Sequence, residues 1–369
     1  MAYTQPGPFP VGVTTLTLAK SNKVEVWYPA VAGTTGEVSY DVRDFVPDAI
    51  RKILTADIPA TYSFAGARDA DAADGPFPVV LFSHGFTGIR LQSTFLTAHL
   101  ATWGFIVAAP DHPSRDLAHV LGGTASGDAA DAVDDLLATL DLVITEGTSA
   151  TSRLNARVDA TKVVAVGHSA GGGTVVGAAA DQRIGGYVSL ASGVQLPASS
   201  VTGTASSGEP PAGPTATDAG TAPPSTAPKQ LPAKPSFFLA GSLDGVVPAA
   251  TVTIPSFQAV PTPTRLWVID GVGHNGFDDF CTFGNGTGII GVADASGLGA
   301  VLDAQPQLRK LGTDGCVAPD VAVTETFPVI RHAVTAWIRN QFGIDATGVG
   351  LGREVAGAYP VKVTIDERP

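Results

Sequence analysis

The chain carries little positive charge. Among its 369 residues, 22 Lys and Arg stand against 34 Asp and Glu, which gives a net charge of −12. Proteins that bind nucleic acid need a Lys/Arg surface to displace the counterions of the phosphates. Hydrophobic runs are short too, because even the apolar stretches at residues 78–82 and 162–166 fall far below the ~20 residues of a membrane span. The composition therefore predicts a folded globular protein with no nucleic-acid partner and no membrane span.

A secretion signal and a cysteine framework are also missing. Residues 1–10 contain no basic start followed by an apolar run, so no signal peptide is visible and we expect a cytoplasmic protein. A mature secreted chain that had gained a new initiator Met would look the same. The two cysteines, Cys281 and Cys316, either form one disulfide or stay reduced, as is usual in the cytoplasm. Closing that loop would contribute about 4 kcal/mol in the chain-entropy model.

Apolar residues alternate between strand and helix patterns along most of the chain. Short apolar runs bounded by Gly, Pro or Asn predict strands at residues 11–18, 23–28, 78–83, 105–109, 162–166, 187–190, 236–239 and 265–269. Helical spacing predicts helices at residues 90–103, 129–144, 170–180 and 327–341. Pro328 is expected in the first turn of the last helix, where its missing N–H costs little. The alternation predicts a doubly wound, mostly parallel α/β sheet with helices on both faces.

One domain accounts for the whole chain. Residues 1–75 are expected to form N-terminal strands and a loop, and residues 76–193 and 235–343 the core. Residues 194–234 are rich in Pro, Ala, Thr, Ser and Gly, which predicts a flexible insertion. A second, Gly-rich insertion spans residues 282–320 and carries Cys316. Residues 344–369 are expected to be a C-terminal tail.

The central motif is Gly-His-Ser-Ala-Gly-Gly at residues 167–172. By itself a G-x-S-x-G pattern is weak evidence in a chain with 43 glycines. Its context is specific, because an apolar strand runs into it and a small-residue helix runs out of it. A serine at such a sharp turn projects above the sheet, and the flanking glycines let strand and helix approach closely. We therefore predict that Ser169 is a nucleophile, against the alternative of a Gly-rich turn without chemistry.

An oxyanion hole needs two backbone N–H groups near the nucleophile. The residue after the serine, Ala170, supplies the first. The second is expected from the loop Ser-His-Gly-Phe-Thr-Gly at residues 83–88, which follows an apolar strand, and Phe86 is the best candidate.

In a fold of this kind the acid and the base both come after the nucleophile along the chain. Of the two histidines after Ser169, His332 lies within the terminal helix and is expected to be a packed or surface residue. His274 lies in a loop after the strand at 265–269 and is the predicted base. Asp244, just past the strand at 236–239, is the predicted acid that orients the imidazole. The acids nearer in sequence are expected to be solvated loop residues, namely Asp270, Asp278 and Asp279.

Three further residues are expected to contact substrate. These are His84 and Gly85, in the oxyanion loop, and His168, which would line the acyl pocket or pack beneath the turn without titrating. Asp111 and His112 follow another strand, and a structural role is favoured over one at the edge of the site. The sequence offers no Cys/His/Asp cluster with metal spacing and no glycine loop followed by the Lys of a phosphate site. We therefore expect neither a metal nor a cofactor.

The chain resembles the branch of the α/β-hydrolases that contains the platelet-activating-factor acetylhydrolases, the chlorophyllases and the actinobacterial cutinases. The resemblance rests on PVVLFSHGFTG, LATWGFIVAAPDH and RVDATKVVAVGHSAGGG, and covers about residues 7–30 and 75–343 with gaps. It implies an α/β-hydrolase fold, a triad of Ser169, Asp244 and His274, and oxyanion donors at Phe86 and Ala170.

The chain also departs from these relatives. Cutinases usually have Tyr at the Phe86 position and Met at the Ala170 position, and their loops are short where residues 194–234 are inserted. In the acetylhydrolase of blood plasma the acid follows the preceding strand, which here reads GGYVSLASG and offers no carboxylate. The substrates of these relatives therefore do not transfer to this chain.

The sequence as a whole predicts a serine carboxylesterase. Its expected substrates are short- to medium-chain esters, with polyesters as a further expectation from the resemblance to cutinases. Two alternatives remain open: an acyltransferase that uses the same triad, and a non-catalytic binding module of the same fold. The oligomeric state is left open.

Overall fold

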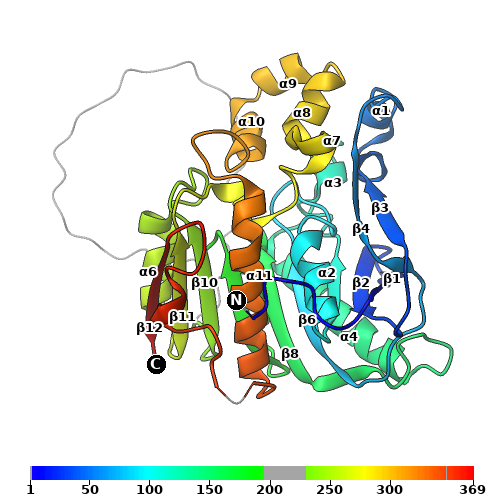
Figure 1. The fold of residues 1–369 in the computed structure, drawn as a ribbon. Coiled ribbons are helices and arrows are strands. Elements are labelled where there is room, and N and C mark those ends of the chain that lie inside the picture. Colours follow the sequence, from blue (N-terminus) through cyan, green and yellow to red (C-terminus); the bar gives the residue numbers. More distant parts are fainter. Residues whose placement is uncertain (1, 195–229, 346) are drawn as a thin grey trace, which may run out of the picture.

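The computed structural model describes residues 2–194, 230–345 and 347–369. Most of the predicted flexible insertion at residues 194–234 lies outside the described residues. The described chain folds around one ten-stranded sheet in the order β12-β11-β10-β9-β8-β6-β7-β2-β1-β5 (Figure 1). Its strands are β1 Val11–Thr17, β2 Lys23–Pro29, β5 Ala67–Arg68, β6 Phe77–Ser83, β7 Ile106–Pro110, β8 Val158–His168, β9 Ile184–Leu190, β10 Ser236–Gly241, β11 Thr264–Ile269 and β12 Val363–Arg368.

The middle of the sheet is parallel, and antiparallel pairs flank it. Strands β7, β6, β8, β9, β10 and β11 run parallel, whereas β2 pairs antiparallel with β7 and β1, and β12 pairs antiparallel with β11. The short edge strand β5 runs parallel to β1. Every residue of β6 is buried, as expected for a strand covered on both faces. The predicted doubly wound α/β sheet is confirmed.

Helices cover both faces of the sheet. The helices that pack against it are α2 Thr94–Thr102, α4 Ala129–Thr148, α5 Ala170–Ala178, α6 Ile254–Ala259 and α11 Val323–Gln341. Helices α2 and α11 pack on one face and α4, α5 and α6 on the other, so that two clusters of buried apolar side chains form, one on each side. At the amino end of α4 the Asp128 carboxylate accepts from two backbone N–H groups in a capping box with Asp131.

Two segments rise above the carboxyl ends of the central strands (Figure 1). One is N-terminal. It contains the antiparallel pair β3 Glu37–Asp41 and β4 Thr61–Ala65, and α1 Asp48–Arg51 lies in the chain between these two strands. The other contains α7 Phe283–Gly286, α8 Gly288–Ala295, α9 Gly299–Asp303 and α10 Pro306–Thr313. The remaining short elements are α3 Leu117–Leu121 and the helical turns at Val42–Phe45, Ala249–Thr253, His274–Phe277 and Arg353–Val355.

The sequence-based elements need three corrections. The insertion at residues 282–320 is mostly helical, because its apolar side chains find a partner surface that overrides the low helix propensity of glycine. The tail at residues 344–369 ends in a strand of the sheet, since Val363 and Ile365 alternate inward along β12. Helix α11 begins at Val323, upstream of Pro328, and Thr326 anchors the added turn by donating to the carbonyl of Gly276 over 2.9 Å.

Candidate active site

Ser169 lies in the sharp turn between β8 and α5. Its backbone has φ 56° and ψ −124°, a combination that L-residues rarely adopt. The Ser169 side chain makes no capping hydrogen bond to the first turn of α5. The glycines on either side permit the close approach of strand and helix. A Cβ at Gly167 would lie 2.2 Å from the carbonyl oxygen of Gly171, and one at Gly171 would lie 1.9 Å from that of Ser83. The turn therefore requires glycine at both positions.

Three side chains from different loops meet at this turn. The Nε2 atom of His274 lies 2.9 Å from the Ser169 Oγ atom, and its Nδ1 atom lies 2.9 Å from the Oδ2 atom of Asp244. Asp244 follows β10 and His274 follows β11, the next parallel strand, so both loops open at the same edge of the sheet as Ser169. All three residues are buried. The predicted nucleophile, base and acid are thus within hydrogen-bonding reach of one another.

Asp244 is held in a fixed orientation. Its Oδ1 atom accepts from the backbone N–H groups of Val246 and Val247 at 2.9 and 2.6 Å, which leaves Oδ2 directed at the imidazole. A carboxylate held in this way can accept from the imidazole Nδ1–H and so fix the tautomer of His274.

Asp314 ties the acid loop to the base loop and was not found from the sequence. Its Oδ1 atom accepts from the His274 backbone N–H at 2.6 Å, and its Oδ2 atom accepts from the Gly245 N–H at 3.1 Å. The Asn275 side-chain amide donates to the Asp314 carbonyl over 2.9 Å. No motif marks Asp314, because it comes from the helical insertion and meets these loops only through tertiary packing.

A disulfide joins Cys281 to Cys316. Cys281 lies just after the turn that carries His274, and Cys316 follows Asp314 closely in the chain. The bond therefore ties the end of the helical insertion to the loop that presents the base.

The predicted oxyanion donors lie beside Ser169. Neither the Phe86 nor the Ala170 N–H donates to an acceptor within the described part of the chain. A Cβ at Gly85 would lie 3.1 Å from Cβ of Ser169, so the loop at residues 83–88 passes directly over the nucleophile. That loop is anchored on both sides, because Gly85 donates to Gln92 Oε1 and Thr87 donates to the carbonyl of Arg115.

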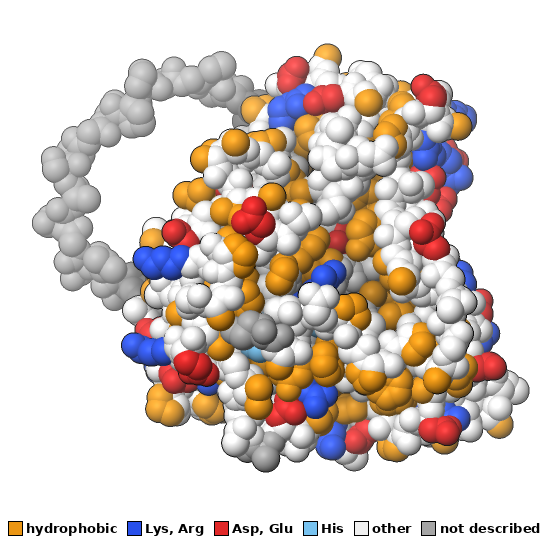
Figure 2. Space-filling model, viewed as in Figure 1, with side chains coloured by type: hydrophobic (Ala, Val, Ile, Leu, Met, Phe, Trp, Pro, Cys, Tyr) orange, Lys and Arg blue, Asp and Glu red, His pale blue; other side chains and the backbone are white. Residues whose placement is uncertain are grey.

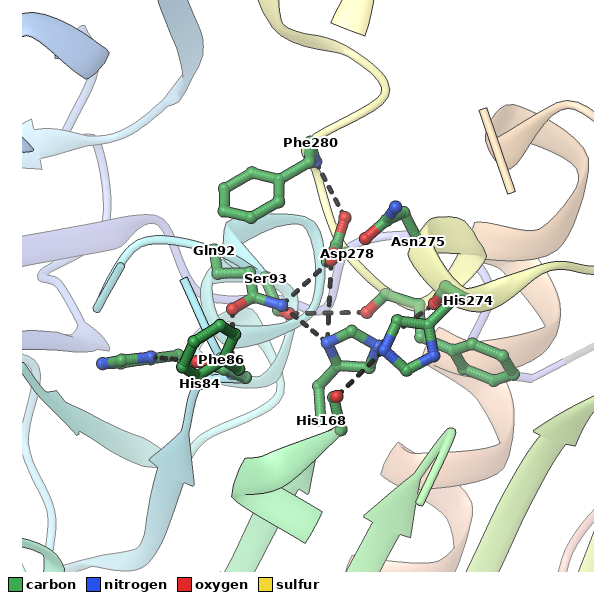
Figure 3. Close-up of polar contacts among 12 residues, drawn as sticks. His84, Phe86, Gln92, Ser93, His168, His274, Asn275, Asp278 and Phe280 are labelled. Carbon is green, nitrogen blue, oxygen red and sulfur yellow. Dashed lines mark hydrogen bonds and ion pairs between the residues drawn. The ribbon is translucent and has the colours of Figure 1, made fainter. Parts of the chain in front are cut away.

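Gln92 links the oxyanion loop to the base loop through His168 and Asp278 (Figure 3). Its Nε2 atom donates to His168 Nδ1 at 2.6 Å and to Asp278 Oδ2 at 2.9 Å. His168 in turn donates through Nε2 to the carbonyl of His274 at 3.1 Å. Burial holds the pKa of His168 well below its usual value, so the ring stays neutral and acts as a fixed donor. His168 lines the cavity described below, as expected.

Two of the three acids expected to be solvated are buried. Asp278 and Asp279 are fully inaccessible, whereas Asp270 is exposed and accepts from Ser242 Oγ. The cause is the packing of α2 against this loop, where the Phe95 N–H donates to Asp279 Oδ2 at 2.9 Å. Burial raises the pKa of Asp278 well above its ordinary value and that of Asp279 to about 7.

Asp279→Asn should change how stability depends on pH. The carboxyl keeps its proton in the folded state up to about pH 7, whereas the unfolded chain loses it near pH 4. Since the folded state then binds more protons, this group's contribution is full below about pH 4 and falls as the pH rises to about 7, with a limiting slope of about 1.4 kcal/mol per pH unit. Urea unfolding between about pH 4 and 8 should show the variant free of this decline. A pH-independent difference from wild type would contradict the assignment, and Asp270→Asn is the matched control.

His84 does not fulfil its predicted role as a substrate contact. Its Nδ1 atom lies 2.8 Å from the carbonyl oxygen of Gly85, and its Nε2 atom accepts from the His112 N–H at 3.1 Å. Both ring nitrogens are therefore used in holding the loop, and His84 is absent from the cavity lining, which Gly85 does reach. His112 is buried against Ser83 and Asp135, the structural role that was favoured for it. Asp111 pairs with Arg90.

A cavity that is open to solvent lies above Ser169 and His274. Its walls come from the N-terminal segment at residues 42–54 and from helices α8–α10, and hydrophobic side chains gather in the central hollow of the face in Figure 2. Ser169 also borders a second cleft on the side of Ala170 and Thr174. In the described part of the chain, no cluster of His, Cys, Asp or Glu could hold a metal, and no helix is long and apolar enough to cross a bilayer.

Comparisons with known proteins find one family match and similar solved structures. The family model of the chlorophyllases matches residues 69–204, which include the oxyanion loop and Ser169. Among solved structures, a ferulic acid esterase from Streptomyces cinnamoneus is similar at a TM-score of 0.64 and 20% sequence identity, over 98% of each chain. A search of curated proteins finds no match. The fold and the family match define an α/β-hydrolase-fold carboxylic ester hydrolase. The predicted resemblance is confirmed for the chlorophyllases and for the α/β-hydrolase fold, whereas the likeness to cutinases stays a prediction.

Proposed function

We propose that this protein hydrolyses carboxylic esters through an acyl-enzyme on Ser169. The observation that carries the proposal is the unbroken chain of contacts from Ser169 Oγ through His274 to Asp244 at 2.9 Å each. In this arrangement one imidazole nitrogen can take the serine proton while the other stays bonded to the carboxylate.

The reaction has two steps. Ser169 Oγ attacks the ester carbonyl as His274 takes its proton, and the oxyanion is stabilised by the N–H groups of Phe86 and Ala170. The protonated His274 then gives its proton to the leaving alcohol, and the acyl group stays on Ser169. Water then attacks the acyl carbonyl as His274 takes its proton. The bond between the acyl group and Oγ breaks, His274 returns the proton to Ser169 Oγ, and the carboxylic acid leaves.

Short- to medium-chain esters are the proposed substrates. Polyester hydrolysis stays a prediction from the resemblance to cutinases. The ferulate esters suggested by the name of the structural neighbour are a further comparison substrate, because the two chains share their fold over nearly their full length. The disulfide between Cys281 and Cys316 favours an oxidising compartment, and of the two expected localisations we propose the secreted one.

An active-site label tests the proposal. An alkyl p-nitrophenyl phosphonate should phosphonylate Ser169 with release of one equivalent of nitrophenol, because the oxyanion hole and His274 activate this serine above all others. Peptide mass spectrometry should find the adduct on Ser169. His274→Ala should slow labelling by about 10³-fold or more. An adduct on another serine, or equal labelling of both variants, would reject the proposed mechanism.

A further inference from the structure

The cavity above Ser169 is lined by two segments that lie outside the ten-stranded sheet. Val42, Ile50 and Leu54 come from the N-terminal segment, and Ile289, Leu302 and Leu308 come from the opposite helices α8–α10. Both sets face a common space whose floor contains Ser169 and His274. A group attached to the scissile ester would therefore extend between the two segments.

The walls of this cavity are mostly aliphatic. Among the described residues that line it, none is a Lys, Arg, Asp or Glu. Phe86, at the oxyanion loop, is 47% exposed, and Leu121 on the N-terminal side is 38% exposed. Large apolar side chains that stay exposed beside a reactive serine indicate a surface that a ligand covers.

The polar side chains that line the cavity outside the catalytic residues already use their N–H and O–H donors within the protein. The Gln92 amide donates to His168 and Asp278 and accepts from Gly85, so it has no hydrogen left for a ligand. The Thr87 hydroxyl donates to the carbonyl of Phe86, and the Asn275 amide donates to the carbonyls of Leu311 and Asp314. A hydroxyl carried away from the catalytic residues, among the aliphatic side chains of the two walls, would lose its water without gaining a partner.

The helical side of the cavity is held in place before any ligand binds. The disulfide between Cys281 and Cys316 and the bonds of Asp314 fix the end of α10 to the base loop. A preformed apolar cavity loses little ordering entropy on binding, so its shape and chemistry decide the preferred substrate.

We propose that this cavity selects esters that carry an extended aliphatic chain. It disfavours esters of acids that carry a phenolic hydroxyl, such as ferulic acid. The inference rests on the proposed esterase function and names its substrate class. Each methylene that enters the cavity should raise kcat/KM by about two- to fourfold, until the chain reaches the end of the apolar walls. A phenolic hydroxyl in the same place should lower kcat/KM by about tenfold or more relative to an apolar group of the same size.

The experiment compares substrates and cavity variants. kcat/KM is measured for p-nitrophenyl esters from acetate to dodecanoate, for acetate esters of the matching alcohols, and for methyl ferulate beside methyl cinnamate. Leu302→Asn places an amide on the cavity wall and should lower the ratio of octanoate to acetate activity by about tenfold. Val301→Asn is the matched control, because Val301 lies on the same helix α9 but is 53% exposed and outside the lining.

The outcomes separate the inference from the proposed function. A rise with chain length in either series that Leu302→Asn abolishes and Val301→Asn preserves would support the inference. If hydrolysis depends on Ser169 but acetate is the best substrate, or methyl ferulate surpasses methyl cinnamate, the inference is wrong and the esterase function stands. If no ester in the set gives Ser169-dependent hydrolysis, both fail. Acetate activity also reports whether each variant is folded.

Discussion

Ser169→Ala is expected to lower kcat for p-nitrophenyl esters by about 10⁵–10⁶-fold while KM and the melting temperature change little. The loss is large because the proposed reaction has no other nucleophile and because His274 and Asp244 act only through this hydroxyl. The residual rate should reflect the oxyanion donors alone. Stability should hold or rise slightly, since the strained turn at Ser169 is set by the backbone and not by the hydroxyl. Steady-state kinetics and a thermal melt measure both effects.

A second serine provides the control for this variant. Ser192 is also buried and borders the second cleft beside Ser169, but it makes no contact with His274. Ser192→Ala should therefore retain activity within a few-fold of wild type. Equal loss in both variants would point to a general disturbance of the site, and full activity of Ser169→Ala would remove Ser169 from the mechanism.

Product analysis with an added alcohol distinguishes the two alternatives to hydrolysis. An acyltransferase with this triad would pass the acyl group to an added alcohol in preference to water, so the ratio of new ester to free acid would rise steeply with alcohol concentration. A binding module would show neither product. The complete set of contacts at Ser169, His274 and Asp244 argues against the binding module, because loss of one member is the usual mark of such proteins.

The residues that the sequence revealed share one property. Ser169, His274 and Asp244 each follow a buried strand directly, and the carboxyl ends of parallel strands meet at one edge of a sheet. Local pattern and topology therefore bring them together without any knowledge of side-chain packing. The same reasoning gave the oxyanion loop after β6.

The residues that the sequence did not reveal depend on contacts between distant segments. Asp314 meets the His274 and Gly245 backbones from a helical insertion that the sequence shows only as a Gly-rich stretch. Gln92 joins two loops that are far apart in the chain. Asp278 and Asp279 lie in a loop and were expected to be solvated, but the packing of α2 over them explains their burial. None of these contacts leaves a periodic pattern in the sequence.

Asp244→Asn is expected to lower kcat by about 10³–10⁴-fold with a small change in KM. An amide of nearly the same shape can still accept from the Val246 and Val247 N–H groups, so the loop should stay in place. The amide nitrogen, however, would replace Oδ2 and place N–H groups where the Nδ1–H of His274 needs an acceptor. The imidazole would then hold its proton on the nitrogen that faces Ser169, which is the wrong tautomer for a base, and the charge formed during attack would lack its carboxylate.

Two neighbouring acids make this variant a discriminating one. Asp270 is nearer to His274 in sequence but is exposed and bonded to Ser242, so Asp270→Asn should leave kcat unchanged within about twofold. Asp314 contacts the His274 backbone N–H, with no contact to the ring. If Asp270→Asn caused the larger loss, or if Asp244→Asn kept more than about a tenth of wild-type kcat, Asp244 could not be the residue that orients the base. A large loss confined to Asp244→Asn would show that the carboxylate at the end of β10 acts through the tautomer of His274.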